Sequence, residues 1–409
     1  MARRRDSSGN LDYLLATVVA ALVIIGLVMV YSASYYLGYK EYGQPTYFLV
    51  RQILWAVVGS VALLAMTRLE YHAWQRYSIL IMAATLLLLV ALLFVGSQRH
   101  GAQRWFLGGS IQPSELAKLA VIIYIATWLA SKGEQIRQVT YGLIPFAIII
   151  GLVTGLILLQ PDFSTAILVA ATAFTMFFLA GAEPRQLAVS GVIGVLVIGL
   201  LILQVPYARE RLLIFLNPLE DPTDRGFQVA QSLRAMHQGR GLGVGLGKGQ
   251  YKFGPVFLWH SDTIFAIVGE ELGLIGCLVV IGLFAILAYR GFRTAQQAPD
   301  AFGMLLAAGI TCWLVFQALI NIAATTAALP FTGITLPFIS FGGSSLVTSL
   351  AGVGLLLSVS KSVQKAGRQS ASFDLEWRDR RARLSRSRRA RRTTYQRRTE
   401  RREERTGWR

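Results

Sequence analysis

The sequence predicts an all-α polytopic membrane protein with about ten transmembrane helices, a long outer loop between helices 7 and 8, and both termini in the cytoplasm. The first observation is composition: 54% of the 409 residues are hydrophobic and 15% are charged, against roughly 45–50% and about 25% in soluble domains. The second is that apolar runs of roughly 20 residues, enough to cross about 30 Å of hydrocarbon as a helix, recur along the chain. The third is that the short connections between these runs keep their basic residues on one side.

Ten apolar runs are long enough to span a membrane. They are residues 12–36, 47–67, 77–96, 115–131, 141–160, 164–182, 187–205, 262–289, 303–325 and 335–359. The first run follows the basic sequence MARRR and superficially resembles a signal peptide. It extends from Tyr13 to Tyr31, however, and so exceeds the roughly 7–15 apolar residues of a cleaved signal sequence. We therefore expect it to remain as the first span.

Lysine and arginine in the short connections predict which side of the membrane each connection occupies. One side holds Arg3, Arg4, Arg5, Arg68, Arg76, Lys132, Arg137, Arg185, Arg290 and Arg293. That side is predicted to be the cytoplasm, which leaves residues 206–261 as an extracytoplasmic loop. The loop carries seven basic residues, but long loops cross the membrane largely regardless of charge. The expected organisation is a basic cytoplasmic N-terminus at 1–11, a membrane core at 12–360 and a basic cytoplasmic tail at 361–409.

The formal net charge of +18 is concentrated in the tail, because residues 361–409 contribute 18 basic and 6 acidic side chains. This segment has too little apolar periodicity to offset its ordering entropy and is predicted to be disordered. Beside a membrane it would hold anionic lipid headgroups. Nucleic acid is not an expected partner, since no aromatic platform or folded binding module accompanies the basic residues. Cys277 and Cys312 lie in apolar runs and are interpreted as small core residues, which excludes a disulfide scaffold.

Ionisable residues in or beside the spans are the candidates for function, because a charge at the membrane centre costs roughly 2.5–3.5 kcal/mol. The stretch GAQRWFLGGSIQPSELAKLA holds Arg104, Trp105, Glu115 and Lys118. Pro113 suits a helix start. Glu115 and Lys118 are then three residues apart on one helical face, close enough to pair. The alternative is an ion pair that only neutralises two charges where a span begins.

A second group of acids occurs in HSDTIFAIVGEELG. Asp262 stands where water meets the membrane, and Glu270 and Glu271 follow deeper in the same span. Helix capping explains an acid at Asp262 but not two more within the span, so at least one of the three is predicted to be functional. A zinc site from His260, Asp262 and His237 is the weaker alternative, because no closely spaced ligand pair supports it.

Three further stretches have a structural interpretation beside a functional one. Asp162 in LLQPDFSTA lies in a tight outer turn, where capping of the next helix is the simpler explanation. ALPFTGITLPFISFGGSSL interrupts an apolar run with prolines and paired glycines, which predicts a broken helix lining a cavity; helix packing through small residues is the alternative. Its candidate residues are Ser340, Gly342, Gly343, Ser344 and Ser345. The segment from Gly239 to Gln250 departs from the phosphate-loop pattern and is interpreted as a flexible outer segment.

Taken in order, these stretches resemble the FtsW/RodA/SpoVE family, the SEDS peptidoglycan glycosyltransferases. The resemblance rests on GAQRW with QPSELAKL, on QPDFSTA, on HSDTIFAIVGEELG and on TLPFISFGGSSL, and it covers nearly the whole membrane core. GEELG, TLPFIS and the basic extensions look more like the division members of the family than the elongation members. Departures are small: Thr263 and Phe341, for example, stand where Phe and Tyr are usual, and no charged position is lost.

The resemblance implies polymerisation of lipid II at the outer face of a bacterial cytoplasmic membrane, with release of undecaprenyl diphosphate, during septal cell-wall synthesis. Asp262 matches the family's essential outer acid and would act as a general base, and Glu115 and Lys118 match its functionally sensitive pair. Candidates for binding the diphosphate are Arg104, Lys118, Arg209 and Arg211. A divalent cation, Mg²⁺ or Mn²⁺, held partly by Asp262 is the alternative. The implied partners are a class B penicillin-binding protein, which is a transpeptidase, and other division proteins.

Other functions stay open on the sequence alone. An elongation-type polymerase would use the same site. A flippase that moves lipid II across the bilayer would also have broken helices, buried acids and a cavity. A scaffold that recruits division proteins through its tail would tolerate Asp262→Ala but not the loss of residues 361–409.

Overall fold

Ten apolar helices build the membrane core, as the hydropathy of the sequence predicts. The structure is a computed structural model that describes residues 12–95, 97–99, 102–105, 112–216, 227–253 and 260–363. Within these residues, eight helices are long and apolar enough to cross a membrane, and Ser78–Phe94 and Phe163–Leu179 are shorter apolar helices. The chain is thus a multi-pass helical membrane protein. The predicted N-terminus at 1–11 and the tail from 364 onward lie outside the described residues.

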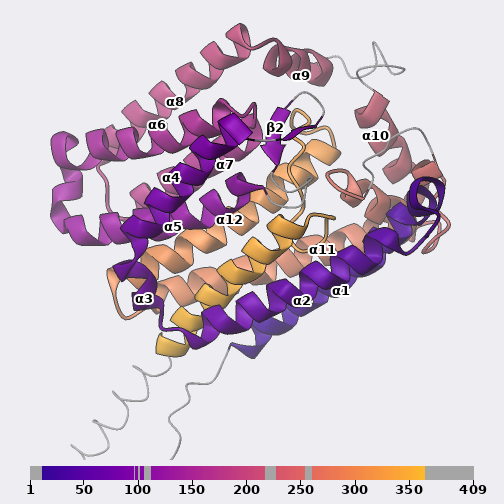
Figure 1. Cartoon of the computed structure of the whole chain (residues 1–409), viewed down its shortest axis with the longest axis horizontal. Helices are drawn as coiled ribbons and strands as arrows, with labels where there is room; N and C mark the ends of the chain where they lie inside the picture. The colour runs from indigo at the N-terminus through magenta and orange to yellow at the C-terminus, as the bar shows by residue number, and fades with distance from the viewer. Residues whose placement is uncertain are drawn as a thin grey trace, which may run out of the picture. The chain divides into compact units, whose positions relative to one another are not determined.

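The elements follow one another along the chain with short connections (Figure 1). The helices that precede the long loop are α1 (Tyr13–Tyr42), α2 (Tyr47–Arg68), α3 (Tyr71–Arg76), α4 (Ser78–Val95), α5 (Pro113–Lys132), the 3-10 helix η2 (Gly133–Arg137), the π-helix η3 (Val139–Leu143), α6 (Ile144–Leu158), α7 (Phe163–Leu179) and α8 (Pro184–Gln204). After them come α9 (Pro206–Leu216), α10 (Phe227–Gly239), the 3-10 helix η4 (Tyr251–Phe253), α11 (Ile264–Gln296), α12 (Ala301–Thr325) and a final helix, Gly343–Val363.

A small β-hairpin interrupts the helices among the described residues. Strands β1 (Ser97–Arg99) and β2 (Ala102–Trp105) pair antiparallel between α4 and α5. Arg104 and Trp105 therefore belong to β2, and the placement of their side chains lies outside what the structure describes. The predicted roles of these two residues stay predictions.

Acidic residues cap the beginnings of the spanning helices α1 and α12. Asp12 accepts a hydrogen bond from the Leu15 amide at the start of α1, and Asp300 accepts one from the Gly303 amide at the start of α12. Such caps satisfy backbone N–H groups that have no partner inside the helix. Asp12 also pairs with Arg290 of α11 at 2.7 Å, so that the beginning of α1 is held to the last turns of α11.

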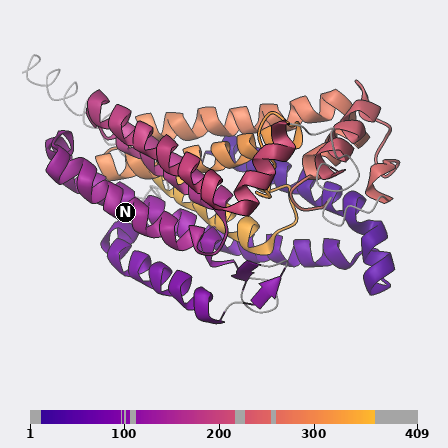
Figure 2. The same cartoon turned by 90° about the horizontal axis from the view of Figure 1, so that it is seen from above.

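Helix α12 lies at the centre of the core and contacts α5, α7 and α11 (Figures 1 and 2). Of its most apolar stretch, 72% is buried within the protein, against 6% for α8. Helix α8 instead presents apolar side chains such as Val195 and Leu203 outward, as a helix in contact with lipid does. Polar side chains on α12 are therefore enclosed by protein, where each one needs a partner.

The last span begins later than the sequence predicts. The helix starts at Gly343 and not at residue 335, because the chain from 326 to 342 forms turns and extended backbone. Phe338 has a φ of +67° and Ala327 a φ of +56°, both incompatible with a continuing helix. The predicted broken helix in this stretch is thus confirmed as non-helical backbone. Cys277 and Cys312 are buried and unpaired, as expected of core residues.

Candidate functional site

Asp262 occupies the position just before α11, where the long loop that precedes this helix ends. The residue is 8% exposed. The amide nitrogen of Asn321, on α12, donates to the Asp262 main-chain oxygen at 2.7 Å and to the Ile334 oxygen at 2.6 Å. One buried side chain therefore fixes the backbone of Asp262 to the broken segment between α12 and the last helix.

Arg211 of α9 approaches the same carboxylate. Its Nη1 donates to the Phe331 oxygen at 2.8 Å, and its guanidinium lies 5.7 Å from the centre of the Phe331 ring. Gly333 is exposed and has a φ of +70°. A Cβ atom built at Gly333 would be 3.6 Å from Asp262 Oδ2 and 3.8 Å from Arg211 Nη2. The carboxylate and the guanidinium thus lie next to the same exposed glycine.

Burial raises the pKa of Asp262 to about 6, an effect that nearby backbone N–H groups and Arg211 partly offset. Oxygen Oδ1 of Asp262 is buried and has no hydrogen-bond partner in the described structure. A carboxylate that is deprotonated at neutral pH, but holds a proton more tightly than a free one does, suits a general base. The geometry therefore supports the catalytic role predicted for Asp262.

His260 serves a packing role beside Asp262. Its ring lies 4.5 Å from the Phe48 ring and 5.3 Å from the Phe341 ring, and its main-chain oxygen accepts a hydrogen bond from the Phe341 amide at 2.8 Å. Burial lowers the pKa of His260 to about 4, so the ring is neutral at neutral pH. Among the described residues no three His, Cys, Asp or Glu side chains lie together as a metal site, and the zinc alternative is not supported.

Glu115 and Lys118 form the predicted pair on α5, and the pair is buried. Lys118 Nζ lies 2.7 Å from Glu115 Oε2, with side chains 2% and 8% exposed. The same nitrogen donates to Gln317 Oε1 of α12 at 2.9 Å, and Gln317 donates in turn to the Thr335 oxygen at 3.0 Å. The pair therefore does more than neutralise charge, because it is connected to the broken segment that Asn321 also holds.

The broken segment is fixed by polar contacts from both sides. Thr335 Oγ1 and Ser345 Oγ are 3.0 Å apart, and Ser340 Oγ accepts a hydrogen bond from the Leu336 amide at 2.8 Å. Gln52 of α2 donates to the Ser340 oxygen at 3.0 Å and accepts from the Gly342 amide at 3.4 Å. A Cβ at Gly343 would lie 2.4 Å from the Trp55 indole, so a glycine is required there. Ser344 is half-buried in the first turn of the last helix.

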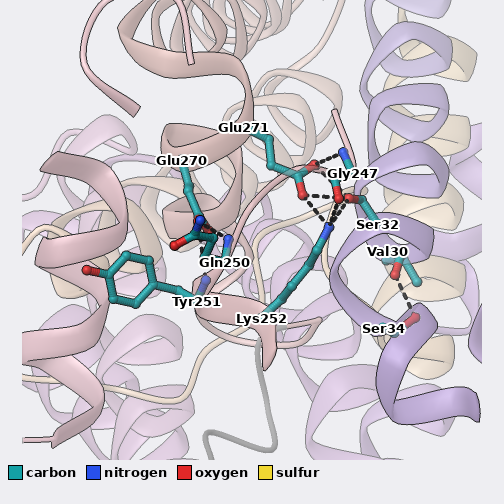
Figure 3. A network of polar contacts seen from close by, with 9 residues as sticks. All are labelled: Val30, Ser32, Ser34, Gly247, Gln250, Tyr251, Lys252, Glu270 and Glu271. Carbon is teal, nitrogen blue, oxygen red and sulfur yellow. Dashed lines mark hydrogen bonds and ion pairs between the residues drawn. The ribbon is translucent and has the colours of Figure 1, made fainter. Parts of the chain in front are cut away.

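Glu271 takes part in a second buried network (Figure 3). Its carboxylate lies 2.8 Å from Lys252 Nζ, with both side chains fully buried, and it accepts hydrogen bonds from Ser32 Oγ at 2.7 Å and from the Gly247 amide at 3.1 Å. Neighbouring Glu270 accepts from the Gln250 and Tyr251 amides. The two acids of GEELG thus hold residues 247–252, at the end of the long loop before α11, against this helix.

The glycine-rich segment 239–250 completes the hydrogen bonding of α11. Helix α11 is interrupted at Gly273, which has a φ of +67°. The carbonyl groups of Glu270 and Glu271 accept from the Val244 and Gly245 amides, and the Leu274 and Ile275 amides donate to main-chain oxygens of Arg240 and Gly241. The interpretation of this segment as flexible is therefore wrong: its glycines permit close packing against the interrupted helix.

Asp162 and Arg209 have simpler surroundings. Asp162 caps α7 by accepting from the Thr165 amide, and it also accepts from Gln112 and Ser114 at the start of α5. Capping is thus confirmed, and the contact joins two of the predicted stretches. Arg209 is exposed on α9, whereas Arg211 on the same helix faces Asp262.

Sequence reasoning missed the uncharged residues that assemble the site. Gln317 and Asn321 are four residues apart in LVFQALINIA, a spacing that places both on one face of α12. Buried amides on one face of a central helix are a detectable signal, because each must find a partner. Ser32 carried no such signal, because it is 239 residues from Glu271 and 220 residues from Lys252 in the chain. Lys252 is 19 residues from Glu271, a separation that no helical or strand spacing connects.

A comparison with protein-family models matches residues 12–365 to the FtsW/RodA/SpoVE family, described as cell cycle proteins. A Geobacter metallireducens protein named probable peptidoglycan glycosyltransferase FtsW is 40% identical over 353 residues, which cover 85% of this chain and 94% of the relative. Stage V sporulation protein E of Bacillus subtilis is 40% identical over 354 residues, covering 86% of this chain and 97% of the relative.

Solved structures of proteins from the same family have a similar fold. A chain from a structure described as the structural coordination of polymerization and crosslinking by a peptidoglycan synthase complex superposes with a TM-score of 0.73 at 32% identity, covering 86% of this chain and 98% of that one. The crystal structure of the Thermus thermophilus rod shape determining protein RodA gives a TM-score of 0.65 at 29% identity, covering 86% of this chain and 96% of that one.

Proposed function

The chain belongs to the FtsW/RodA/SpoVE family of cell cycle proteins, and on that premise we propose that it is a peptidoglycan glycosyltransferase whose general base is Asp262. It joins lipid II units into glycan strands and releases undecaprenyl diphosphate, in septal cell-wall synthesis. The observation that carries the proposal is the buried Asp262 carboxylate, which lies beside the Arg211 guanidinium at exposed Gly333.

The reaction needs one proton acceptor and one site for negative charge. The acceptor sugar hydroxyl attacks the anomeric carbon of the donor, and its proton passes to Asp262. The bond from that carbon to the diphosphate oxygen breaks, and its electron pair leaves with the diphosphate. The raised pKa of Asp262, about 6, makes it a stronger base than a solvated carboxylate while keeping it deprotonated at neutral pH.

Arg211 is the favoured partner for the leaving diphosphate. Its guanidinium lies beside the same glycine as the carboxylate, and a fixed cation stabilises the charge that develops on the leaving group. A divalent cation at this position would need ligands beyond Asp262, because no cluster of three candidate ligands occurs in the described part of the chain. Phosphate oxygens of the substrate are the ligands that Mg²⁺ commonly adds to one carboxylate.

The Glu115–Lys118 pair acts indirectly, through residues that support the site, and not on the reacting atoms themselves. Lys118 holds Gln317, and Gln317 holds Thr335 of the broken segment. Because Asn321 holds both Ile334 and Asp262, the pair supports the wall of the site. Its role is to position this wall, not to exchange protons with substrate.

The proposal includes a location and a partner. The active site faces outward from the bacterial cytoplasmic membrane, on the side opposite the basic connections. A class B penicillin-binding protein supplies the crosslinking activity, in keeping with the similarity to a chain from a complex that coordinates polymerization and crosslinking. The basic tail binds anionic lipids of the inner leaflet.

The decisive experiment is glycan synthesis by the purified protein with its transpeptidase partner on labelled lipid II. Asp262→Asn keeps the size of the side chain and removes the base, so we expect glycan ladders to disappear. Asp12→Asn is the matched control, because Asp12 is also a buried carboxylate but pairs with Arg290 near the other end of α11. Normal polymerisation by Asp262→Asn would refute the assignment. Absence of product from folded wild type, together with lipid II translocation in liposomes, would establish a flippase instead.

A further inference from the structure

A pocket of about 660 Å³ lies beside α10 in the outer loop. Buried Ala230 and half-buried Leu233 line one part of it, and exposed Arg234, His237 and Arg240 line another. Its volume falls within the roughly 300–1,000 Å³ typical of ligand sites. The pocket therefore combines an apolar wall with two arginines and a histidine.

Packing against α11 fixes the walls of this pocket. Met236 of α10 reaches Gly269, where a Cβ would lie 3.0 Å from Met236 Cγ, and Gly239 lies directly against the Gly269 carbonyl. Tyr251, which also lines the pocket, donates its amide hydrogen to Glu270 at 3.2 Å. Residues of α10 and Tyr251 are thus attached to the same stretch of α11.

The basic residues of the pocket form no ion pair with a carboxylate of the described residues. Within the described ranges, the ion pairs involve other residues, and none includes Arg234, His237 or Arg240. Arginines gathered in a concave site focus positive potential and attract anions. Planar guanidinium groups also match phosphate oxygens with paired hydrogen bonds.

Exposed leucines that follow the pocket residue Arg240 in the chain favour a lipid as the source of the anion. Leu242 and Leu246 follow Arg240 in the glycine-rich segment and are 81% and 54% exposed. Apolar side chains beside basic ones are the pattern of a protein surface that enters the headgroup region of a bilayer. A soluble anion or an acidic peptide would leave both leucines without a function.

We propose that this pocket binds the phosphate or diphosphate group of a membrane lipid, with Arg234 and Arg240 on the phosphate oxygens and the leucines against the acyl or prenyl chain. Two lipids supply this chemistry. One is a phospholipid such as phosphatidylglycerol, and the other is a polyprenyl diphosphate. The choice of the second rests on the proposed function, since lipid II and undecaprenyl diphosphate both carry a diphosphate.

The test is native mass spectrometry of the full-length protein with three separate probes: undecaprenyl diphosphate, phosphatidylglycerol and inorganic pyrophosphate. Arg234→Gln/Arg240→Gln should weaken lipid binding about tenfold or more, because it removes two charge-assisted contacts. Lys40→Gln/Lys248→Gln is the matched control: it removes the same charge from two exposed residues that do not line the pocket, and binding should stay within about twofold. Arg234→Lys, which keeps the charge, should retain most of the binding.

Each other result overturns the proposal. Unchanged lipid binding by the double variant, or equal loss in the control, means that the pocket is not the site. Pyrophosphate binding as tight as lipid binding means that the ligand is a soluble anion. If the double variant no longer binds the transpeptidase partner but still binds lipid, the pocket is a protein-docking surface. Because binding is read directly and is also measured on Asp262→Asn, failure of the polymerase assignment would be seen separately.

Discussion

Asn321 and Asp262 are joined by a hydrogen bond of 2.7 Å from a buried α12 side chain to the main chain of the proposed base. One helical turn earlier, Gln317 accepts from Lys118 of α5 at 2.9 Å. Side chains four residues apart lie on the same helical face. One face of α12 therefore connects Asp262 with the Glu115–Lys118 pair, although the sequence separates the two stretches by more than 140 residues.

Asn321→Leu should reduce polymerisation more than it reduces the amount of folded protein. The substitution leaves the Asp262 and Ile334 carbonyls without their donor, at roughly 1–3 kcal/mol for each one that stays buried. The backbone of Asp262 is then no longer fixed, and an error of about 1 Å at a reacting group costs on the order of 100-fold in rate. Labelled lipid II assays and thermal unfolding measure the two effects.

Thr311→Val is the control for Asn321→Leu, because Thr311 is buried on the same helix but its hydroxyl donates only to the Ala307 carbonyl of that helix. We expect activity close to wild type. Full activity of Asn321→Leu would mean that Asp262 is positioned by its neighbours in the chain alone.

Lys118→Met should strongly destabilise the protein. It leaves the Glu115 carboxylate buried without its cation, and breaking a buried pair in this way costs roughly 3–5 kcal/mol. Glu115→Gln/Lys118→Met removes both charges and should recover much of that stability. Thermal unfolding of wild type, Glu115→Gln, Lys118→Met and the double variant gives a double-mutant cycle, which measures the interaction within the pair. A cost for the double variant equal to the sum of the single ones would show that the pair does not interact.

The spans were predictable because hydropathy alone determines them. The beginning of α2 at Tyr47 and the end of α12 at Thr325 agree with the predicted positions. The beginning of the last helix was not predictable. Residues 335–342 are as apolar as a helix, but the chain turns at Phe338, where the backbone φ is positive. Apolarity reports burial, and burial does not distinguish a helix from broken backbone packed inside protein.

The site was only partly predictable for a related reason. Asp262 and the Glu115–Lys118 pair carry charge, and charge in an apolar chain is conspicuous. Glu271 was conspicuous too, but its partners Lys252 and Ser32 come from the outer loop and from α1. Local spacing gives no information on such contacts, so the structural role of Glu271 could not be separated from a catalytic one.

Polymerisation should fall as the pH decreases through about 6, because burial raises the pKa of Asp262 to about 6 and only the deprotonated form accepts a proton. Protonation of Asp262 has the opposite effect on the stability of the folded state. A carboxyl group whose pKa is higher in the folded state favours the folded state on protonation, so this group does not cause acid unfolding. Initial rates and unfolding temperatures measured from about pH 5 to about pH 8 separate the two.

Arg211→Gln should shift the loss of polymerisation at acidic pH toward higher pH. The positive charge of Arg211 lowers the pKa of Asp262, so its removal raises that pKa further, and the maximum rate should also fall because the diphosphate loses a cation. Arg209→Gln is the matched control, since Arg209 is exposed on the same helix. If the pH at which the rate falls were the same in Arg211→Gln as in wild type, the titrating group would not be Asp262.

Gly273→Ala should open the contact between α11 and the glycine-rich segment 239–250. Residue 273 has a φ of +67°, and a Cβ there would lie 2.3 Å from the Gly243 nitrogen. With a ψ of −164°, this backbone conformation is essentially restricted to glycine and costs on the order of 1–3 kcal/mol for alanine, and the collision displaces Gly243. Amide hydrogen exchange at Val244 and Gly245, which donate to the Glu270 and Glu271 carbonyls, should accelerate. Gly282→Ala on the same helix meets open space and should be neutral or stabilising by up to about 1 kcal/mol. If Gly273→Ala left exchange at these two amides unchanged, the segment would not depend on the break in α11 for its structure.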